Sequence, residues 1–359
     1  MSVRIIAYYL PQYYPTPEND AWWGKGFTEW TNVAKARPLF RDHLQPKIPA
    51  DLGFYDLRVP ETQQAQSDLA IKYGIDGFCY WHYWFGNGKV LLDYPIKKVL
   101  ETGKPEISFC FAWANQTWGG LPYGDGFERI LIEQTYPGRK DYEDHFYYVL
   151  PYFRDKRYSR INSKPIFQIN HPSDLPDVSY FISFWKELAV SNGLPGIYFI
   201  AHELPEYKYM DYGFDGLSLF TPQHLFIRYN RSIKERLKQT LYNKIRKNKL
   251  SIYDYRKIVE ASNYNDLDQS GNYFPVAIPN WDHSPRSKNK AKIIINNTPE
   301  LFKQNLINCY NLIRNKPEEE RIIFIKAWNE WAEGNFLEPD MQFGHSNLIS
   351  VRNFKASII

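Results

Sequence analysis

The chain has 359 residues, and its formal net charge of +4 comes from 44 Lys and Arg against 40 Asp and Glu. This length fits one large domain or two ordinary ones, and so mild a charge, with no recognition motif beside it, argues against a nucleic-acid-binding domain. Aromatic residues make up 17% of the chain, an excess that needs either a very aromatic core or a site that uses ring faces.

The cysteines and the N-terminal residues indicate in which cellular compartment the protein is expected. Cys79, Cys110 and Cys309 are an odd number scattered through apolar segments, which predicts reduced core thiols and a reducing environment. The first apolar run is too short for a secretion signal, and no apolar stretch approaches the length of a bilayer span. We therefore expect a soluble, cytoplasmic protein, although a chain trimmed of a leader would look the same.

Eight apolar, strand-like runs alternate with helical or loop segments, and most are apolar on both faces, as in parallel strands covered by helices. These runs are Arg4–Leu10, Ile75–Tyr83, Glu106–Trp113, Lys164–Asn170, Gly196–His202, Gly213–Phe220, Phe274–Trp281 and Arg321–Ala327. Helical spacing occurs in Leu57–Tyr73, Leu91–Glu101, Asp141–Phe153, Tyr180–Asn192 and Pro299–Asn315. The alternation predicts a single (β/α)₈ barrel of the TIM type over residues 1–359. The alternative is a doubly wound open sheet.

The long connection from Pro11 to Asp56 follows the first predicted strand and shows no convincing element. A structureless connection of this length inside a compact domain is usually functional, so we expect it to form one wall of a cleft. Trp22 and Trp30 are candidates to line sugar subsites, and Glu29 is a candidate to bind hydroxyls. The alternative is a packed aromatic lid in which Glu29 caps a turn.

Polar and aromatic residues gather where the predicted strands end, which is where catalytic barrels keep their chemistry. The candidate substrate-binding residues at these ends are Tyr8, Tyr9, Tyr80, His82, Tyr83, Trp84, Trp113, Asn115, Gln116, Trp118, His171, Trp281 and Asp282. For Asp282 the alternative to binding a hydroxyl is an ion pair with Arg286.

A second insertion, basic and helical in its sequence, covers about residues 227–272 before the seventh predicted strand. Most of the positive excess lies in its 228–257 stretch, and a solvated helix face explains this most simply. Peripheral contact with an anionic membrane or polysaccharide is the alternative.

Cofactor and metal motifs are missing from the sequence. No GxxxxGKS loop and no GxGxxG after a strand is present, so we expect no nucleotide cofactor. The eight histidines show neither HExxH nor a Cys–His spacing, and we expect no metal site. Convergence of His82, His171 and His202 from separate strands stays an open alternative.

The last predicted strand breaks at Trp328 and continues as Asn329, Glu330, Trp331, Ala332 and Glu333. Two carboxylates thus leave a strand end between indole rings, and such surroundings raise the pKa of at least one. One protonated and one ionised carboxyl group are the equipment of glycosidic bond cleavage. We therefore predict that Glu330 and Glu333 are catalytic and that Trp328, Asn329 and Trp331 contact the substrate.

Several long motifs carry a resemblance to a known family. They are YYLPQYY, LGFYDLR, GIDGFCYWHYWF, FAWAN, AWNEWAEG and FLEPD. They resemble WbsX-type proteins of bacterial polysaccharide gene clusters, which are often labelled glycosyltransferases yet are similar to the family 99 glycoside hydrolases, the endo-α-mannosidase and endo-mannanase barrels. The resemblance covers nearly the whole chain except residues 227–272.

The resemblance implies roles for the two carboxylates. Glu330 would act as a base on the sugar's own 2-hydroxyl and form a 1,2-anhydro-sugar, and Glu333 would be the general acid and then the base, with net retention. Direct attack by a carboxylate is the plainer alternative for a close pair. The chain departs from the family pattern at Gln116, where a carboxylate is usual, so the sugar bound there is open.

Together these patterns predict a retaining, endo-type glycoside hydrolase that acts on a bacterial polysaccharide or its precursor, mannan-like or of the O-antigen or capsule kind. Its partner would be a carbohydrate, without metal or cofactor. Two alternatives remain. One is a glycosyltransferase of polysaccharide biosynthesis, and the other is a non-catalytic glycan-binding barrel.

Overall fold

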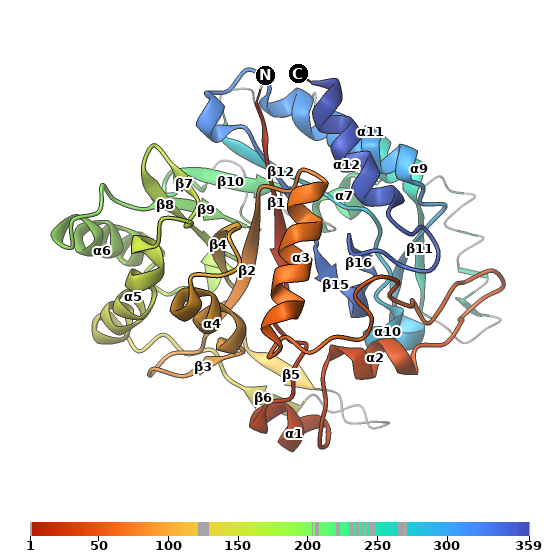
Figure 1. Ribbon diagram of the computed structural model, residues 1–359, viewed down its shortest axis with the longest axis horizontal. Coiled ribbons are helices and arrows are strands. Elements are labelled where there is room, and N and C mark those ends of the chain that lie inside the picture. The colour runs from red at the N-terminus through yellow and green to blue at the C-terminus, as the bar shows by residue number, and fades with distance from the viewer. Residues whose placement is uncertain are drawn as a thin grey trace. The chain divides into compact units, whose positions relative to one another are not determined.

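The computed structural model describes residues 2–120, 129–202, 204, 208–219, 223–229, 233, 237, 240, 241, 243, 244, 249–264, 267 and 271–358. Within these residues, eight parallel strands form a closed barrel with helices between them, which confirms the predicted fold class (Figure 1). The barrel strands are β1 (Arg4–Tyr9), β2 (Gly77–Trp84), β4 (Ser108–Trp113), β8 (Lys164–Ile169), β9 (Tyr198–Ala201), β10 (Gly216–Leu219), β12 (Tyr273–Ala277) and β14 (Ile322–Ile325). Their order is β1-β14-β12-β10-β9-β8-β4-β2, and pairing of β1 with β2 closes the ring.

The barrel strands are buried on both faces, which explains their continuous apolar runs. All four residues of β14 are fully buried, and this strand lies between β1 and β12 with Phe324 opposite Ile6 and Val276. Neighbours on both sides satisfy the backbone groups, while helices cover the outer side chains. The sequence signal of a parallel strand is therefore strong here.

Each predicted helical segment overlaps an observed helix. These helices are α3 (Pro60–Lys72), α4 (Tyr94–Thr102), α5 (Arg139–Arg154), α6 (Val178–Ser191) and α11 (Pro299–Ile313). The start of α11 shows why: the Thr298 side chain accepts a hydrogen bond from the N–H of Leu301, and Pro299 occupies the first turn.

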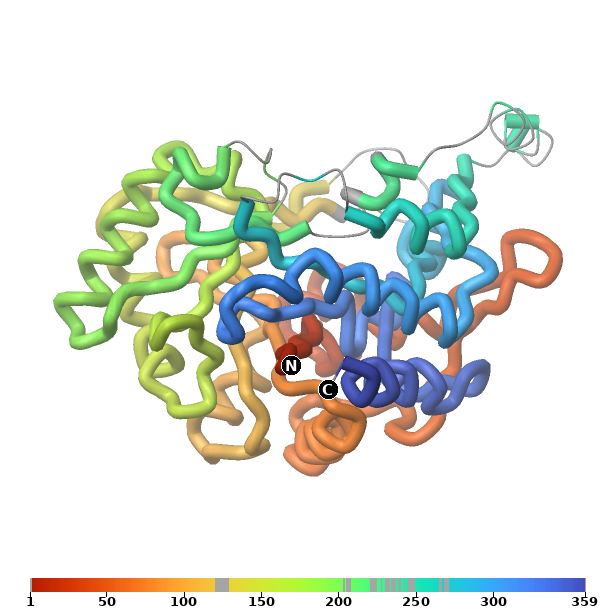
Figure 2. The backbone as a smooth tube through the Cα atoms, turned by 90° about the horizontal axis from the view of Figure 1, so that it is seen from above, coloured from red at the N-terminus to blue at the C-terminus, as the bar shows by residue number. Residues whose placement is uncertain are grey.

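The C-terminal helix α12 (Ser346–Ser357) was not predicted. It packs along α11, where Ser350 Oγ donates to the carbonyl of Pro299 at 2.9 Å and the rings of Tyr310 and Phe354 lie 6.0 Å apart. In Figures 1 and 2 the end of α12 lies beside the start of β1.

The chain divides into two compact units. Unit 1 comprises Met1–Asp76, Phe220–Leu267 and Pro275–Ile359, and unit 2 comprises Gly77–Leu219 and Asp268–Phe274. Each unit is described by itself below. The assignment of residues 1–359 to a single domain stays a prediction.

The first long connection is more ordered than expected. Helices α1 (Pro17–Trp23) and α2 (Glu29–Lys35) lie within it, so the prediction of a structureless Pro11–Asp56 segment is wrong. These short helices lack a periodic apolar pattern, and capping hydrogen bonds stabilise them instead. At the start of α1, the side chain of Thr16 accepts a hydrogen bond from the N–H of Asn19 at 3.1 Å. Such caps stabilise helices of two turns that carry no clear amphipathic pattern.

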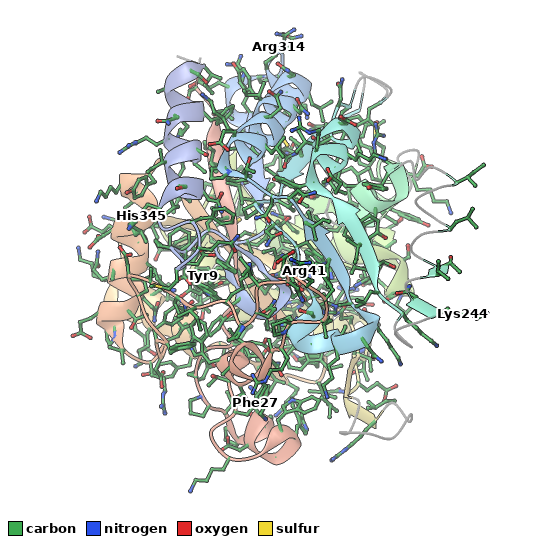
Figure 3. The ribbon with its side chains drawn as sticks, turned by 90° about the vertical axis from the view of Figure 1, so that its right-hand side faces the viewer. Tyr9, Phe27, Arg41, Lys244, Arg314 and His345 are labelled. Carbon is green, nitrogen blue, oxygen red and sulfur yellow. The ribbon has the colours of Figure 1, made fainter. Side chains whose placement is uncertain are left out.

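The second insertion is not purely helical. Within it lie the end of α7 (Gln223–Arg228), strand β11 (Ser251–Asp254) and helix α9 (Tyr255–Ala261). Strand β11 pairs in parallel with β13 (Lys292–Ile295), a strand absent from the prediction. Much of residues 230–248 and 265–270 lies outside the described residues, and Lys244, which is described, lies exposed at the edge of the view in Figure 3.

The structure bears on the expectations about the cysteines and about membrane-spanning segments. Cys79, Cys110 and Cys309 are buried and not disulfide-bonded, as predicted. In the part of the chain that the structure describes, no helix combines the length and apolar character needed to cross a membrane.

Candidate active site

The candidate site of unit 1 is built on the segment that follows β14. A short antiparallel ribbon, β15 (Asn329–Glu330) and β16 (Asn335–Phe336), is joined by a 3₁₀ turn, η4 (Trp331–Glu333). Gly334 ends the turn at φ +66°, and a Cβ there would lie 2.7 Å from the backbone nitrogen of Asp282. Only glycine fits. The N–H of Asp282 in turn donates to the carbonyl of Glu333 at 2.8 Å, which fixes the turn.

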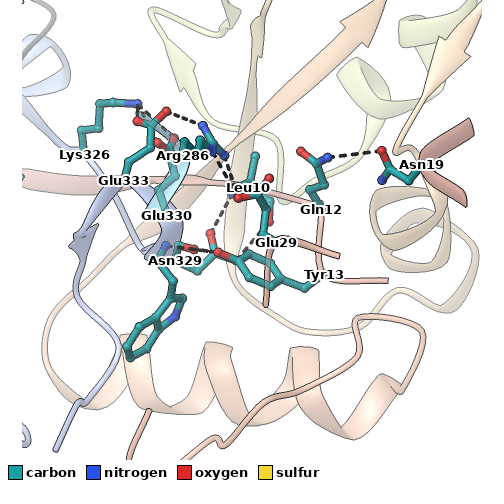
Figure 4. Close-up of polar contacts among 11 residues, drawn as sticks. Leu10, Gln12, Tyr13, Asn19, Glu29, Arg286, Lys326, Asn329, Glu330 and Glu333 are labelled. Carbon is teal, nitrogen blue, oxygen red and sulfur yellow. Dashed lines mark hydrogen bonds and ion pairs between the residues drawn. The ribbon is translucent and has the colours of Figure 1, made fainter. Parts of the chain in front are cut away.

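The two predicted catalytic carboxyl groups lie together (Figure 4). Glu330 is 3% exposed, and both of its oxygens accept hydrogen bonds from Lys326 Nζ, at 2.9 and 3.0 Å. Glu333 is half-buried; it accepts from Arg286 Nη1 at 2.5 Å and lies 3.7 Å from Lys326 Nζ. A hydrogen bond also joins the two carboxyl groups. A proton between them makes this contact favourable, because two ionised carboxylates would repel each other.

The surroundings move the pKa values of the pair in opposite directions. Burial, together with the negative charge of Glu333, raises the pKa of Glu330 despite the positive charge of Lys326. Burial also favours the neutral form of Glu333, but the positive charges of Lys326 and Arg286 outweigh it and hold the pKa of Glu333 below its usual range. The two groups therefore titrate as a coupled pair, with the higher proton affinity at Glu330.

Arg286 connects the pair to the first long connection. It lies on α10 (Ser284–Ser287), and its Nε and Nη2 donate to Glu29 Oε2 at 3.2 and 3.0 Å. Glu29 is 3% exposed at the start of α2, and the negative charges of Glu29 and Glu333 overcome burial and raise the pKa of Arg286. With Lys326 and Glu330 the site thus contains three carboxyl groups and two cations. One proton on the carboxylate pair makes this charged cluster neutral.

A further buried carboxyl group, that of Glu338, supports the η4 turn. Glu338 accepts hydrogen bonds from Trp331 Nε1 at 2.6 Å, Gln66 Nε2 at 2.7 Å and Tyr55 OH at 2.9 Å. Burial raises the pKa of Glu338 to about 7, although these donors favour the charged form. Asn329 is tied to the backbone of Leu10 through both of its amide atoms, at 2.7 and 3.0 Å.

Most aromatic residues predicted to contact substrate in unit 1 lie in the core. Tyr8, Tyr9, Trp328, Asn329 and Trp331 are fully buried. Trp331, for example, stacks on Phe336 at 3.7 Å. The prediction is that these residues contact the substrate, but in the structure their side chains are covered by protein. An aromatic ring at a strand end can turn inward and pack in the core. These residues form the packing that holds the turn.

The remaining predicted residues of unit 1 differ in exposure. Trp22 is half-buried, and Trp30 is buried, with Nε1 donating to the carbonyl of Tyr55 at 2.8 Å. Trp281 is buried, and its ring lies 5.7 Å from Lys326 Nζ.

Asp282 pairs with His43 rather than with Arg286. Asp282 is buried and contacts His43 Nε2 at 2.8 Å and Gln45 Nε2 at 2.6 Å. His43 Nδ1 accepts from the N–H of Leu39 at 3.0 Å, so Nε2 carries the proton that is donated to Asp282. The alternative of an ion pair between Asp282 and Arg286 is therefore wrong, because Arg286 pairs with Glu29 and Glu333 instead.

Unit 2 gathers its predicted residues into a neutral cluster. His82 Nε2 and His145 Nε2 lie 2.8 Å apart, and the ring of Trp84 stacks on His145 at 4.7 Å. Trp113 Nε1 donates to the carbonyl of Trp84 at 2.9 Å. We call His82, Trp84, Trp113 and His145 the histidine cluster. Burial lowers the pKa of His82 to about 3, so the cluster is uncharged at neutral pH.

Other predicted residues of unit 2 divide between core and surface. Tyr80 and Tyr83 are buried, and so is Asn115, which accepts from the N–H of His171 at 2.8 Å. Gln116 is exposed, while Trp118 and His171 are half-buried. Among the described residues, no group of three or more His, Cys, Asp or Glu is arranged to hold a metal ion.

Sequence reasoning missed Lys326, Tyr55, Gln66 and Glu338. One signal was available: Lys326 is a charged residue at the end of a fully apolar strand, four positions before Glu330. A buried lysine at such a place needs a carboxylate partner. The roles of Tyr55 and Gln66 depend on distant segments and left no local signal.

Solved structures with a similar fold include an endo-alpha-mannosidase and a glycoside hydrolase-like protein. The GH99 endo-alpha-mannosidase from Bacteroides thetaiotaomicron, in complex with bis-tris-propane, has a TM-score of 0.59 and 14% identity, covering 99% of this chain and 97% of that one. A glycoside hydrolase-like protein has a TM-score of 0.60 and 12% identity, covering 98% and 93%. At these identities the likeness concerns the fold.

Sequence comparisons show the family. Two proteins from different strains of Xanthomonas campestris pv. campestris, each described as Uncharacterized protein WxcX, are 35% identical over 356 residues. The match covers 98% of this chain but 49% of theirs, so the chain spans about half the length of these relatives. The model of the family described as Glycosyltransferase WbsX matches residues 5–351. The chain therefore belongs to this WbsX family.

Proposed function

We propose that the chain is a retaining glycoside hydrolase that cleaves within a bacterial polysaccharide or its precursor, such as a mannan-like, O-antigen or capsule glycan. One observation carries the proposal: Glu330 and Glu333 are hydrogen-bonded to each other and flanked by Lys326 and Arg286. A carboxylate pair that holds one proton supplies both a general acid and a base. The fold likeness to endo-alpha-mannosidase structures supports a glycan substrate.

In the first step of the proposed reaction, Glu330 removes the proton from the 2-hydroxyl of the sugar. The resulting oxygen attacks C1, the glycosidic bond breaks, and Glu333 donates its proton to the leaving oxygen. The product is a 1,2-anhydro-sugar. The positive charge of Lys326 on Glu330 stabilises the carboxylate that starts this step.

In the second step, Glu333 takes a proton from water, and the water oxygen attacks C1. The bond from C1 to O2 breaks, and Glu330 returns its proton to O2. Two inversions at C1 leave the configuration retained. Arg286 helps here, because it stabilises the ionised Glu333 that this step requires.

In the free protein Glu330 has the higher proton affinity, whereas the first step needs the proton at Glu333. The hydrogen bond between the two carboxyl groups provides a direct path for that transfer. Because the two groups can exchange a proton with each other, we favour the anhydro-sugar route, in which both act as acid or base, over direct attack.

A glycosyltransferase is the second candidate, because the family description names that activity. The same pair would then serve transfer from a nucleotide-linked or lipid-linked donor to an acceptor hydroxyl. Calorimetry with nucleotide sugars separates the two proposals: tight binding of a nucleotide sugar, with no glycan cleavage, favours transfer.

The hydrolase proposal is tested with a panel of mannan-like and bacterial surface glycans. Wild type is compared with Glu330→Gln and Glu333→Gln, and with Glu318→Gln as a control at an exposed glutamate. Each catalytic variant should lose about 100-fold to 10,000-fold in cleavage rate, while the control keeps its rate. Full activity in both variants ends the proposal, and tight binding without cleavage by wild type identifies a glycan-binding barrel.

We also propose a cytoplasmic location, which the three free thiols support. Contact of the basic 228–257 stretch with an anionic membrane stays a proposal as well. Flotation of the protein with anionic vesicles, compared with neutral ones, measures it.

A further inference from the structure

We propose that Glu29 is a positioning residue of the charged cluster: it fixes the guanidinium of Arg286 and thereby sets how readily Glu333 takes up a proton. The role of Glu29 in catalysis rests on the proposed function. The effect of Glu29 on proton uptake by Glu333 can be measured without any substrate.

Geometry ties Glu29 to Arg286 and Arg286 to Glu333. Two N–H groups of the guanidinium converge on one oxygen of Glu29, at 3.0 and 3.2 Å, and a third points to Glu333 at 2.5 Å. The guanidinium is thus held between carboxylates from α2 and η4, as Figure 4 shows. Since Nε and Nη2 are engaged by Glu29, Arg286 is prevented from closing a two-pronged ion pair on Glu333.

Glu29 is itself firmly placed. Its backbone N–H donates to the carbonyl of Gln12 at 3.2 Å. The neighbouring Trp30 packs against Trp331 of η4, with ring centres 5.6 Å apart. Helix α2, which carries Glu29, is therefore fastened to the turn that carries Glu333.

The charges that face Glu333 come from four segments. Lys326 and Arg286 are positive, Glu330 is hydrogen-bonded to Glu333, and Glu29 opposes Arg286 from the other side. Two further titratable groups near these residues are neutral at neutral pH. Burial and the nearby cations lower the pKa of His283 to about 4, and burial with the charge of Glu29 raises the pKa of Tyr13.

The sign of the effect follows from this arrangement. Without the negative charge of Glu29, Arg286 would act on Glu333 alone, and the ionised form of Glu333 would gain stability. Proton uptake by the pair would then need a lower pH. Glu29 thus keeps Arg286 from trapping Glu333 in the charged state, which the first step of the proposed reaction cannot use.

The test follows the carboxyl groups directly. Protein labelled with ¹³C at glutamate Cδ is titrated by NMR, and the signal of Glu333 is assigned by its loss in Glu333→Gln. In Glu29→Gln we expect the titration of Glu333 to move down by about one pH unit. Glu61→Gln is the matched control, since Glu61 lies exposed in the first turn of α3.

Three further results decide the inference. Glu29→Asp keeps the charge and should titrate close to wild type, and Arg286→Gln should move the titration of Glu333 to higher pH, which keeps the test valid if Glu29→Gln does not fold. An unchanged titration in Glu29→Gln, or an equal shift in Glu61→Gln, overturns the inference. If the shift occurs but no glycan is cleaved by wild type, the proposed function fails and the positioning role stands.

Discussion

The charged cluster of unit 1 and the histidine cluster of unit 2 look alike in the sequence and differ in the structure. Both include residues at or just after the ends of barrel strands, and both combine indole rings with titratable side chains. The charged cluster contains carboxylates and cations in contact, with Glu333 and Arg286 reaching solvent. The histidine cluster is buried and neutral, with His82 bonded to His145.

The difference shows what burial does to each kind of group. An imidazole pair can lose its charge and join an aromatic core, because the neutral forms still donate and accept one hydrogen bond. The carboxyl groups beside Lys326 and Arg286 instead keep negative charge in the cluster, because each cation has a carboxylate partner. Aromatic and polar residues at strand ends can therefore belong either to the core or to a functional site. Charged side chains of both signs in contact distinguish the functional site.

The largest expected effect comes from removing a cation from the charged cluster. Lys326→Met leaves the buried Glu330 without its ion partner, and we expect a loss of about 3 kcal/mol in the free energy of unfolding. Urea denaturation measures it. The double variant Lys326→Met with Glu330→Gln should recover most of the loss, and a single variant as stable as wild type would contradict the ion pair.

Glu338 should make unit 1 less stable as pH rises. Its pKa in the folded state is about 7 against an ordinary 4.5, so the folded protein binds the extra proton and loses stability as pH climbs through this window. The full change is roughly 3 kcal/mol. In Glu338→Gln this part of the pH dependence should vanish from urea midpoints, while Glu318→Gln keeps it.

The histidine cluster should respond to pH in the opposite direction. His82 titrates near 3 when folded against an ordinary 6.5, so acid favours the unfolded chain as pH falls below 6.5. His145→Phe removes one buried imidazole and leaves His82 Nε2 without this partner, at a cost of about 2 kcal/mol at neutral pH. Its stability should fall less steeply with acid than that of wild type. An identical acid dependence would mean that His145 does not resist protonation.

The smallest expected effect is at the surface. Gln116 is exposed, and Gln116→Glu should change the free energy of unfolding by less than about 0.5 kcal/mol. Any change in the preferred glycan would then report a contact with substrate. Equal preferences in both proteins would remove Gln116 from the proposed binding residues.

The parts of the fold that depend on local patterns were predictable. Runs such as Ile322–Ile325 are apolar on both faces because they are buried on both faces, and the spacing of Glu330 and Glu333 placed two carboxylates on one turn. The partners of that pair were less accessible. Arg286 and Glu29 are 257 residues apart in the sequence. Asp282 is closer to Arg286 in the sequence and therefore suggested an ion pair, but Asp282 is bonded to His43, which local spacing cannot reveal.

The most direct test of the central claim is a ¹H NMR time course of a glycan that wild type cleaves, with Glu330→Gln and Glu333→Gln alongside. The account predicts that wild type first releases the anomer with the configuration of the substrate and that neither variant releases it at a comparable rate. An inverted first product, or release by both variants at the wild-type rate, would contradict the role of this carboxylate pair.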